Sequence, residues 1–394
     1  MTKVIKGGWL FDGSGSLRQG MAVVLEENRV KEVLPIEQLP AEHAMTVIDA
    51  EGCTVLPGLI DCHVHITSSG DADSSREAGE PDALLALRGA KNSRTLLKAG
   101  FTTVRNMGTR NCIDISIKQA IDRGYVTGPR IITSGQMLTM TGGHGWMSGR
   151  QVDGADDARK GAREQLRAGA EVIKIMATGG VMTPGVEPGS PQLTIEEMRA
   201  AVEEAHKAGR KTATHAQGTT GIKNAVLAGL DSIEHGIFLD DEVIQMMIDR
   251  GVALVPTLVA PYHIVKGGVE AGIPAYAVEK ANRVFEAHRA SFARALAAGV
   301  AIAFGTDCGT PLNRPGSNAL ELQMMVEYGM SPAQALAAAT SVAAQVCDRA
   351  DQIGSISAGK YADILIVKGN VLDDVKLLQD QQNFVAIIKD GQTV

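Results

Sequence analysis

The sequence is poor in aromatic residues, has no cluster of basic residues and contains no long apolar run. Only 4% of its 394 residues are aromatic, and the net charge is −7. Proteins that bind nucleic acids draw on clustered Lys and Arg, so we expect no nucleic-acid partner. No apolar stretch approaches the roughly 20 residues that span a bilayer, and the first residues do not resemble a signal peptide. We therefore expect no membrane association.

The five cysteines are odd in number, widely scattered and without a CxxC pair. This pattern argues against a disulfide framework and against a zinc site made of thiolates. It predicts reduced thiols and a cytoplasmic location. We further expect a small-molecule substrate and a homo-oligomeric assembly.

Short apolar runs separated by turn clusters occupy both ends of the chain, whereas the middle alternates short β-rich runs with helical stretches. The ends, residues 1–57 plus 356–394, predict one small β-sandwich domain formed by both chain termini. The middle, residues 58–355, is typical of parallel βα units, and no nucleotide-binding GxGxxG or GxxxxGK[ST] motif occurs in it. Eight strands in one such segment predict an α/β fold, a (β/α)8 TIM barrel. The expected strands are 58–66, 101–106, 130–134, 171–176, 211–215, 231–235, 253–256 and 301–305.

Residues that commonly bind metals stand where these strands are expected to end. His63 and His65 are two apart on one strand and so share a face, while His215, His235 and Asp307 close three others. Each has an ordinary explanation by itself, because a histidine can cap a strand and Gly-Thr-Asp is a common turn. In a barrel, however, the carboxyl ends of all strands meet at one mouth. The five residues together therefore predict a metal site.

Lys174 is the unexpected residue, because isoleucines flank it in a strand that should be buried. A lysine at a strand edge reaches water, but a buried ammonium is costly and its pKa falls. The free amine can then take up CO2 and become a carbamate, an anionic ligand able to bridge two cations. N and O ligands of this kind suit Zn²⁺, so we expect two divalent ions, with zinc as the expected metal.

Longer motifs resemble the amidohydrolase superfamily. Within it, they are most similar to the imidazolonepropionase-related group, which includes metal-dependent prolidases and Xaa-Arg/Lys carboxypeptidases. The similarity runs from end to end of the chain. The motifs are Pro57-Gly58-Leu59-Ile60-Asp61-Cys62-His63-Val64-His65, Thr141-Gly142-Gly143-His144-Gly145, Ile173-Lys174-Ile175-Met176-Ala177-Thr178-Gly179-Gly180, His215-Ala216-Gln217-Gly218, Ile233-Glu234-His235-Gly236 and Gly305-Thr306-Asp307.

The resemblance implies a binuclear site. His63, His65 and Asp307 would hold one ion, and His215 and His235 would hold the other. Carboxylated Lys174 and a hydroxide would bridge the two ions.

It also implies a hydrolase that cleaves a C–N amide bond, in a dipeptide or an N-acyl amino acid, by attack of the bridging hydroxide. Asp307 would pass a proton to the leaving nitrogen, because an amine leaves poorly unless it is protonated. His144 is expected at the substrate oxyanion or carboxylate. The other residues expected to bind substrate are Tyr262, Gln217 and Arg105.

Other functions stay open at this point. The same site could cleave a xenobiotic amide, carbamate or urea, a lactone or an organophosphate ester, and a non-catalytic scaffold relative is a further alternative. A mononuclear deaminase is disfavoured, because no Glu follows His215 shortly afterwards. Asn106 stands after Arg105 where the group commonly has Asp. The remaining histidines, expected at the surface, are His43, His206 and His288.

Overall fold

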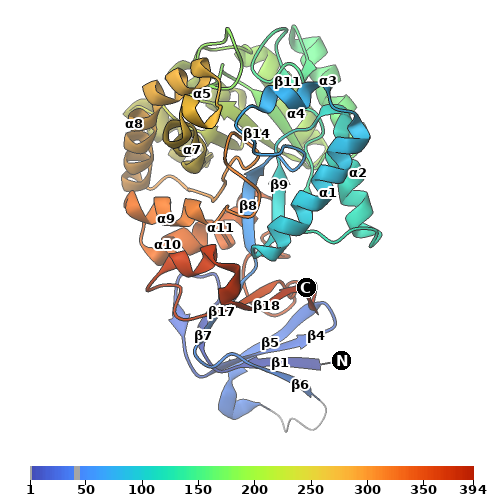
Figure 1. Cartoon of the computed structure of the whole chain (residues 1–394), viewed down its shortest axis with the longest axis vertical. Helices are drawn as coiled ribbons and strands as arrows, with labels where there is room; N and C mark the ends of the chain where they lie inside the picture. Colours follow the sequence, from blue (N-terminus) through green and yellow to red (C-terminus); the bar gives the residue numbers. More distant parts are fainter. Residues whose placement is uncertain (1, 40–44) are drawn as a thin grey trace.

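The computed structural model describes residues 2–39 and 45–394 and combines α-helices with parallel and antiparallel β-strands. Figure 1 shows the strands of both chain ends gathered at one end of the molecule, with the helices and the central strands at the other. Within the described ranges, no helix has both the length and the apolarity needed to cross a membrane.

Strands from the two termini form two sheets that share a hydrophobic cluster. One sheet has the order β5-β4-β1-β6, and the other has the order β19-β18-β17-β7-β2-β3. In the second sheet β7 pairs antiparallel with β17, so that Val55 lies opposite Ile366. Ile5 and Val23 of the first sheet belong to the same buried cluster as this pair. The strands are β1 (Thr2–Lys6), β2 (Trp9–Phe11), β3 (Leu17–Arg18), β4 (Met21–Glu26), β5 (Arg29–Pro35), β6 (Met45–Asp49), β7 (Cys53–Pro57), β17 (Ile364–Lys368), β18 (Phe384–Lys389) and β19 (Gln392–Thr393).

The middle of the chain contains two parallel sheets, with the orders β10-β9-β8 and β12-β11-β13-β14-β15-β16. Seven of the eight strands expected from the sequence are present here. Most are buried along their whole length, as parallel strands covered by helices must be. The strands are β8 (Leu59–Val64), β9 (Phe101–Asn106), β10 (Arg130–Ile132), β11 (Leu138–Thr139), β12 (Arg150–Gln151), β13 (Val172–Met176), β14 (Lys211–Ala216), β15 (Ser232–His235) and β16 (Ala253–Val255).

The prediction of a continuous eighth strand at residues 301–305 is wrong. This segment forms only isolated β-bridge pairing, between Ile302 and Leu254. Its backbone nevertheless joins the two parallel sheets. Ala303 N–H donates to Leu254 C=O at 2.9 Å on one side, and Asp307 N–H donates to His63 C=O at 2.7 Å on the other. The backbone then turns at Asp307, whose φ is +57°.

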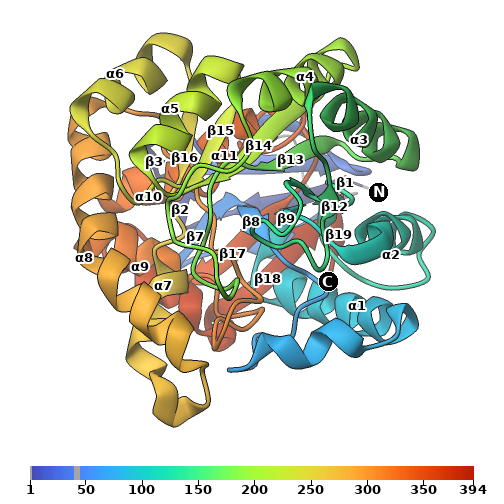
Figure 2. The ribbon, with the colours of Figure 1, turned by 90° about the horizontal axis from the view of Figure 1, so that it is seen from above.

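Helices surround the central strands, as Figure 2 shows from above. The start of α4 illustrates how the sequence sets such a helix. Thr194 Oγ1 accepts the Glu197 N–H and the Glu197 carboxylate accepts the Thr194 N–H, a capping box that satisfies two free donors. The helices are α1 (Asp82–Lys98), α2 (Ile113–Asp122), α3 (Ala155–Ala168), α4 (Ile195–Lys207), α5 (Thr219–Ala228), α6 (Asp241–Arg250), α7 (Val259–Gly267), α8 (Ala275–Ala298), α9 (Leu320–Glu327), α10 (Pro332–Ala338) and α11 (Ser341–Val346).

Candidate metal centre

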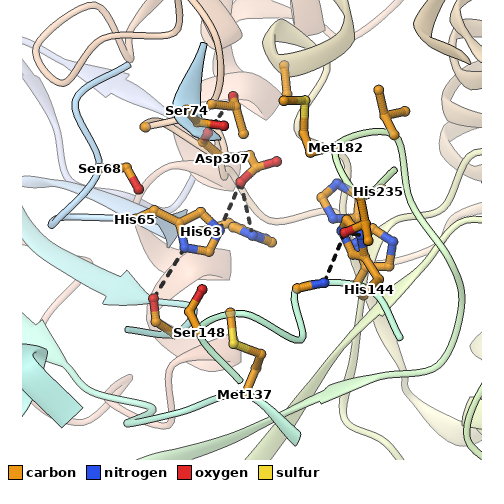
Figure 3. A pocket seen from close by; sticks show the side chains of 18 of the residues that line it. His63, His65, Ser68, Ser74, Met137, His144, Ser148, Met182, His235 and Asp307 are labelled. Carbon is orange, nitrogen blue, oxygen red and sulfur yellow. Dashed lines mark hydrogen bonds and ion pairs between the residues drawn. The ribbon is translucent and has the colours of Figure 1, made fainter. Parts of the chain in front are cut away.

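A cavity of about 280 Å³ lies where the central parallel strands end, and six histidines are among the residues that line it. Figure 3 shows two groups of side chains facing each other across it. His63, His65 and Asp307 are on one side, and His144 and His235 are on the other. The predicted site residues that line this cavity are His63, His65, His144, Lys174, His215, Gln217, His235 and Asp307.

The first group comes from β8 and from the segment that follows residue 301. His65 Nε2 lies 3.1 Å from Asp307 Oδ1, and His63 Nε2 lies 3.4 Å from the same oxygen. One potential ligand atom from each of the three residues falls within a span of 4.8 Å. This spacing brings two imidazoles and a carboxylate to one point, as a divalent cation requires.

The second group comes from the ends of β14 and β15. The ring centroids of His215 and His235 are 4.6 Å apart, and that of His235 is 5.1 Å from His63 in the first group. The parallel register accounts for this closeness, since Ala216 lies opposite His235. His144, on the loop after β11, lies near His215. The centroids of the two rings are 4.3 Å apart, and the rings are tilted by 39°. The four predicted histidine ligands therefore form one continuous cluster.

Lys174 reaches the same cavity from the middle of β13. Lys174 is 1% exposed, and its Nζ has no hydrogen-bond partner among the described residues. Burial lowers the pKa of Lys174 to about 8, although the carboxylate of Glu234 acts in the opposite direction. An orphaned amine at this depth is costly, so its surroundings fit a residue completed by a further group.

Each of the four histidines uses one ring nitrogen for a hydrogen bond, which leaves the other with a free lone pair in the neutral ring. Metal-binding histidines show this arrangement, because the second contact sets the tautomer and the ring orientation. The residues present thus fit metal ions. The contacts are His63 Nδ1 to Glu234 Oε2 at 2.8 Å, His65 Nδ1 to Gly108 C=O at 3.4 Å, His235 Nδ1 to Thr257 Oγ1 at 2.7 Å and His215 Nε2 to Gly179 C=O at 3.2 Å.

Three of the imidazoles are also in the protonation state that binds a cation. Burial, more than any other cause, lowers the pKa of His63, His215 and His235 well below the ordinary value. Asp307 is the opposite case. Burial acts to raise the pKa of its carboxyl, but the contacts of Asp307 with His63, His65 and Lys174 outweigh that effect and lower it. Neutral imidazoles and an ionised carboxylate are the ligand forms of these side chains.

The backbone is strained at the strand ends that carry these groups. His235, Thr257 and Asp307 have φ values of +74°, +53° and +57°, a region that non-glycine residues rarely adopt. Such conformations persist only where the surroundings enforce them. One enforcing contact is the hydrogen bond from His288 Nε2 to the C=O of His235, at 3.0 Å.

A buried ion pair supports the first group from below, and it changes the expectation for Arg105. Arg105 is 1% exposed and does not line the cavity. Its Nη2 donates to Glu234 Oε1 at 2.8 Å, and its Nε donates to the C=O of Cys62 at 2.7 Å. Glu234 in turn bonds His63 through its other oxygen. The structure therefore does not bring Arg105 to a substrate, because its guanidinium is spent on Glu234 beneath the histidines.

The neutral residue after Arg105 has a different partner. Asn106 Nδ2 donates to Asp114 Oδ2 at 3.2 Å, and Asn106 Oδ1 accepts the N–H of Ile66 at 3.0 Å. The charge that balances Arg105 comes from Glu234, so the side chain at position 106 is not needed for that purpose.

A second carboxylate, missed at the level of the sequence, ties β8 to the segment that carries Asp307. Asp61 Oδ1 accepts the N–H groups of His63 and Thr306, at 3.0 and 3.1 Å. Its Oδ2 accepts Thr306 Oγ1 and Asn318 Nδ2, both at 2.7 Å. Asp61 precedes the His63 pair by two residues on the same strand, and this spacing was the signal available in the sequence.

Two further expectations concern Tyr262 and His288. Tyr262 is not among the residues that line the cavity, and its hydroxyl accepts a hydrogen bond from Lys266 Nζ at 3.0 Å. His288 is not at the surface but 2% exposed, since it follows Ala281 and Val284 on the buried face of α8. His206 is partly exposed as expected and pairs with Asp231, and position 43 lies outside the described residues.

Gln217 does line the cavity, and within residues 2–39 and 45–394 its buried Oε1 has no hydrogen-bond partner. The apolar walls around it were not foreseen. They carry several methionines, which adapt their shape to different ligands, and no motif in the sequence marks them. The apolar residues that line the cavity include Met137, Met176, Met182, Ile237, Ile264 and Val284.

Similarity to known proteins extends over the whole chain. The profile of the amidohydrolase family matches residues 54–394. An ochratoxinase from Aspergillus niger is 30% identical over 420 residues, covering 99% of this chain and 86% of the relative. A solved Xaa-Pro dipeptidase with bound methionine is 33% identical with a TM-score of 0.92, over 100% of both chains. A solved prolidase complexed with N-methylphosphonate-L-proline is 33% identical with a TM-score of 0.93, over 100% of this chain and 99% of the other. The resemblance predicted from the motifs is confirmed.

Proposed function

This chain belongs to the amidohydrolase family, and we propose that it is a binuclear metal-dependent hydrolase that cleaves a C–N amide bond in a dipeptide or an N-acyl amino acid. The observation that carries the proposal is the meeting of four imidazoles, one carboxylate and one buried amine at a single cavity. A relative that had lost catalysis would be expected to lack some of these six groups.

Six side chains would hold the ions. His63, His65 and Asp307 would bind one, and His215 and His235 would bind the other. Lys174 would add CO2 at its Nζ, release a proton and bridge both ions as a carbamate. Its low pKa and its lack of a partner support this assignment. Bound divalent cations, for which zinc is the expected element, activate water near neutral pH and polarise a substrate carbonyl.

The remaining chemistry falls to the side chains around that point. Asp307 has its Oδ1 beside two imidazoles and lines the cavity, so it is placed to take a proton from water and deliver it to the leaving nitrogen. His144 would donate to the substrate oxyanion or carboxylate. Gln217 Oε1, which has no partner in the part of the chain that the structure describes, would accept an N–H from the substrate.

The substrate class rests on the relatives and on the cavity walls. The ochratoxinase, the Xaa-Pro dipeptidase and the prolidase support a substrate with an amide bond beside a carboxylate-bearing group. The cavity walls favour an apolar substituent on the substrate, because the side chains of Met182, Ile264 and Val284 that line the cavity are apolar.

The architecture that we propose around this site is the (β/α)8 barrel, residues 58–355. The segment after residue 301 would close it between β16 and β8. Residues 1–57 plus 356–394 would form one β-sandwich domain, supported by the cluster shared between the two terminal sheets. The five free cysteines support a reducing, cytoplasmic location. Homo-oligomer formation stays a prediction.

The experiment is an assay of the protein, loaded with zinc and bicarbonate, against a library of dipeptides and N-acyl amino acids. We expect cleavage of members with an apolar residue, and two bound metal ions per chain. A parallel panel of ureas, carbamates, lactones and organophosphate esters identifies the competing activities. Cleavage confined to that panel would overturn the amide assignment, and fewer than one bound ion per chain would overturn the binuclear site.

A further inference from the structure

His144 is held by contacts that determine which of its nitrogens carries a proton. Its Nδ1 lies 2.8 Å from Thr183 Oγ1. Among the described residues, this is the one hydrogen bond that the imidazole ring makes. The ring also lies against Gly180, where an added Cβ would come within 2.6 Å of His144 Nε2. The position of the ring is therefore set by Thr183 on one edge and by the absence of a side chain at residue 180.

The hydroxyl of Thr183 has a second partner, the backbone N–H of Gly145. The N–H of Gly145 donates to Thr183 Oγ1 at 3.1 Å. The hydroxyl still has one proton to donate, and His144 Nδ1 is the acceptor within reach. If Nδ1 carried the proton instead, the hydroxyl proton of Thr183, a residue that is 4% exposed, would have no acceptor.

The loop that carries Thr183 is itself clamped by α8. Lys280 Nζ donates to the C=O of Thr183 at 2.8 Å and to the C=O of Val186 at 2.5 Å, and the Lys280 side chain is buried. One helix turn earlier, the hydroxyl of Tyr276 donates to the C=O of Met182 at 3.0 Å. These bonds fix the backbone on both sides of Thr183, so that its hydroxyl cannot drift from the imidazole.

We propose that Thr183 is a positioning residue that keeps His144 in the tautomer with its proton on Nε2. His144 lines the cavity, so this tautomer presents an N–H donor to a carbonyl or carboxylate oxygen of the substrate. The other tautomer would present a lone pair there and repel that oxygen. The consequence for turnover rests on the proposed amide hydrolysis, whereas the tautomer itself is a property of the unliganded protein.

The test compares Thr183→Val with Thr183→Ser in the metal-loaded protein. Valine keeps the shape of threonine and removes the hydroxyl, whereas serine keeps the hydroxyl. We expect Thr183→Val to lower kcat roughly tenfold to a hundredfold with unchanged metal content, as removal of a supporting contact does. Thr183→Ser is expected to stay within about threefold of wild type. Equal activity of the valine variant and wild type would overturn the proposal, and so would an equal loss in both variants.

A second readout does not depend on catalysis. Nitrogen NMR of protein labelled with ¹⁵N-histidine reports the protonated ring nitrogen, and a His144→Gln variant assigns the signal. We expect a protonated Nε2 in wild type and in Thr183→Ser, and a mixture of tautomers in Thr183→Val. A protonated Nδ1 in wild type would overturn the proposal. This measurement stands even if no amide is cleaved, which separates a failure of this inference from a failure of the proposed function.

Discussion

The two sides of the cavity differ in whether an imidazole has a charged support. On the side of β8, His63 bonds a fully buried carboxylate, Glu234, which is paired with an equally buried Arg105, whereas His65 contacts the C=O of Gly108. On the side of β14 and β15, the ring contacts are neutral. His215 bonds the C=O of Gly179, and His235 bonds the hydroxyl of Thr257.

The kind of support determines how much a substitution beneath each imidazole would destabilise the protein. A charged support raises the basicity of its histidine, but removal of one partner leaves an uncompensated charge in the protein interior. A neutral support also orients its imidazole ring, and its removal leaves no uncompensated charge in the interior. We therefore expect mutations beneath the first side to damage stability and metal binding together, and mutations beneath the second side to weaken metal binding alone.

The largest effect is expected where the two sides meet, at Lys174. Lys174→Ala should lose at least one metal ion and nearly all activity, because it removes the group proposed to bridge the ions. Lys174→Met is the matched variant, since it fills the space of the side chain without the amine and should show the same loss. Metal analysis and kcat/KM measure both. Full activity in either variant would exclude the carbamate.

Next in size is Glu234→Gln, which tests the charged side. The change leaves Arg105 without a counter-charge, so we expect a loss of about 3–5 kcal/mol in the free energy of unfolding. A drop of roughly tenfold to a hundredfold in metal affinity should accompany it. Denaturant unfolding and metal titration measure the two. Glu242→Gln is the control, because it makes the same change in an exposed ion pair with Lys223, where about 0.5 kcal/mol is the expected limit.

Thr257→Val tests the neutral side and should be milder. Valine keeps the β-branched shape at the strained φ of +53°, so mainly the hydrogen bond to His235 is lost. We expect a cost of about 1 kcal/mol in stability and a loss of metal affinity below that of Glu234→Gln. Thr257→Ser should retain the wild-type affinity. If the valine variant matched or exceeded Glu234→Gln in both losses, the contrast between the two sides would not hold.

The smallest effect is expected from Tyr262→Phe, which lies outside both sides. Its hydroxyl contacts Lys266 at the surface, so kcat/KM should change by less than about twofold and stability by less than about 0.5 kcal/mol. Steady-state kinetics on the best substrate of the library measures this. A loss of tenfold or more would restore Tyr262 as a substrate-binding residue.

Most of the architecture could be predicted from the sequence, because the ends of strands are local features of the chain. Seven of the eight central strands occur where apolar runs predicted them, and the metal-binding residue types follow those runs directly. The prediction of a continuous strand at residues 301–305 is wrong, because an apolar run does not determine whether its backbone pairs in a ladder or only in isolated bridges. The exposure of His288 could have been read correctly, since its spacing from Val284 places it on the buried face of α8.

The candidate metal-binding side chains could be named from the order of residues along the chain. Residues that end parallel strands meet at one edge, whatever the details of packing. How those side chains are held could be seen only in the folded chain. Asp61 meets Asn318 across 257 positions, and Arg105 meets Glu234 across 129. Such contacts depend on how strands far apart in the chain register against one another, and so do the nitrogen that each imidazole leaves free and the direction of Tyr262. No local pattern encodes that register.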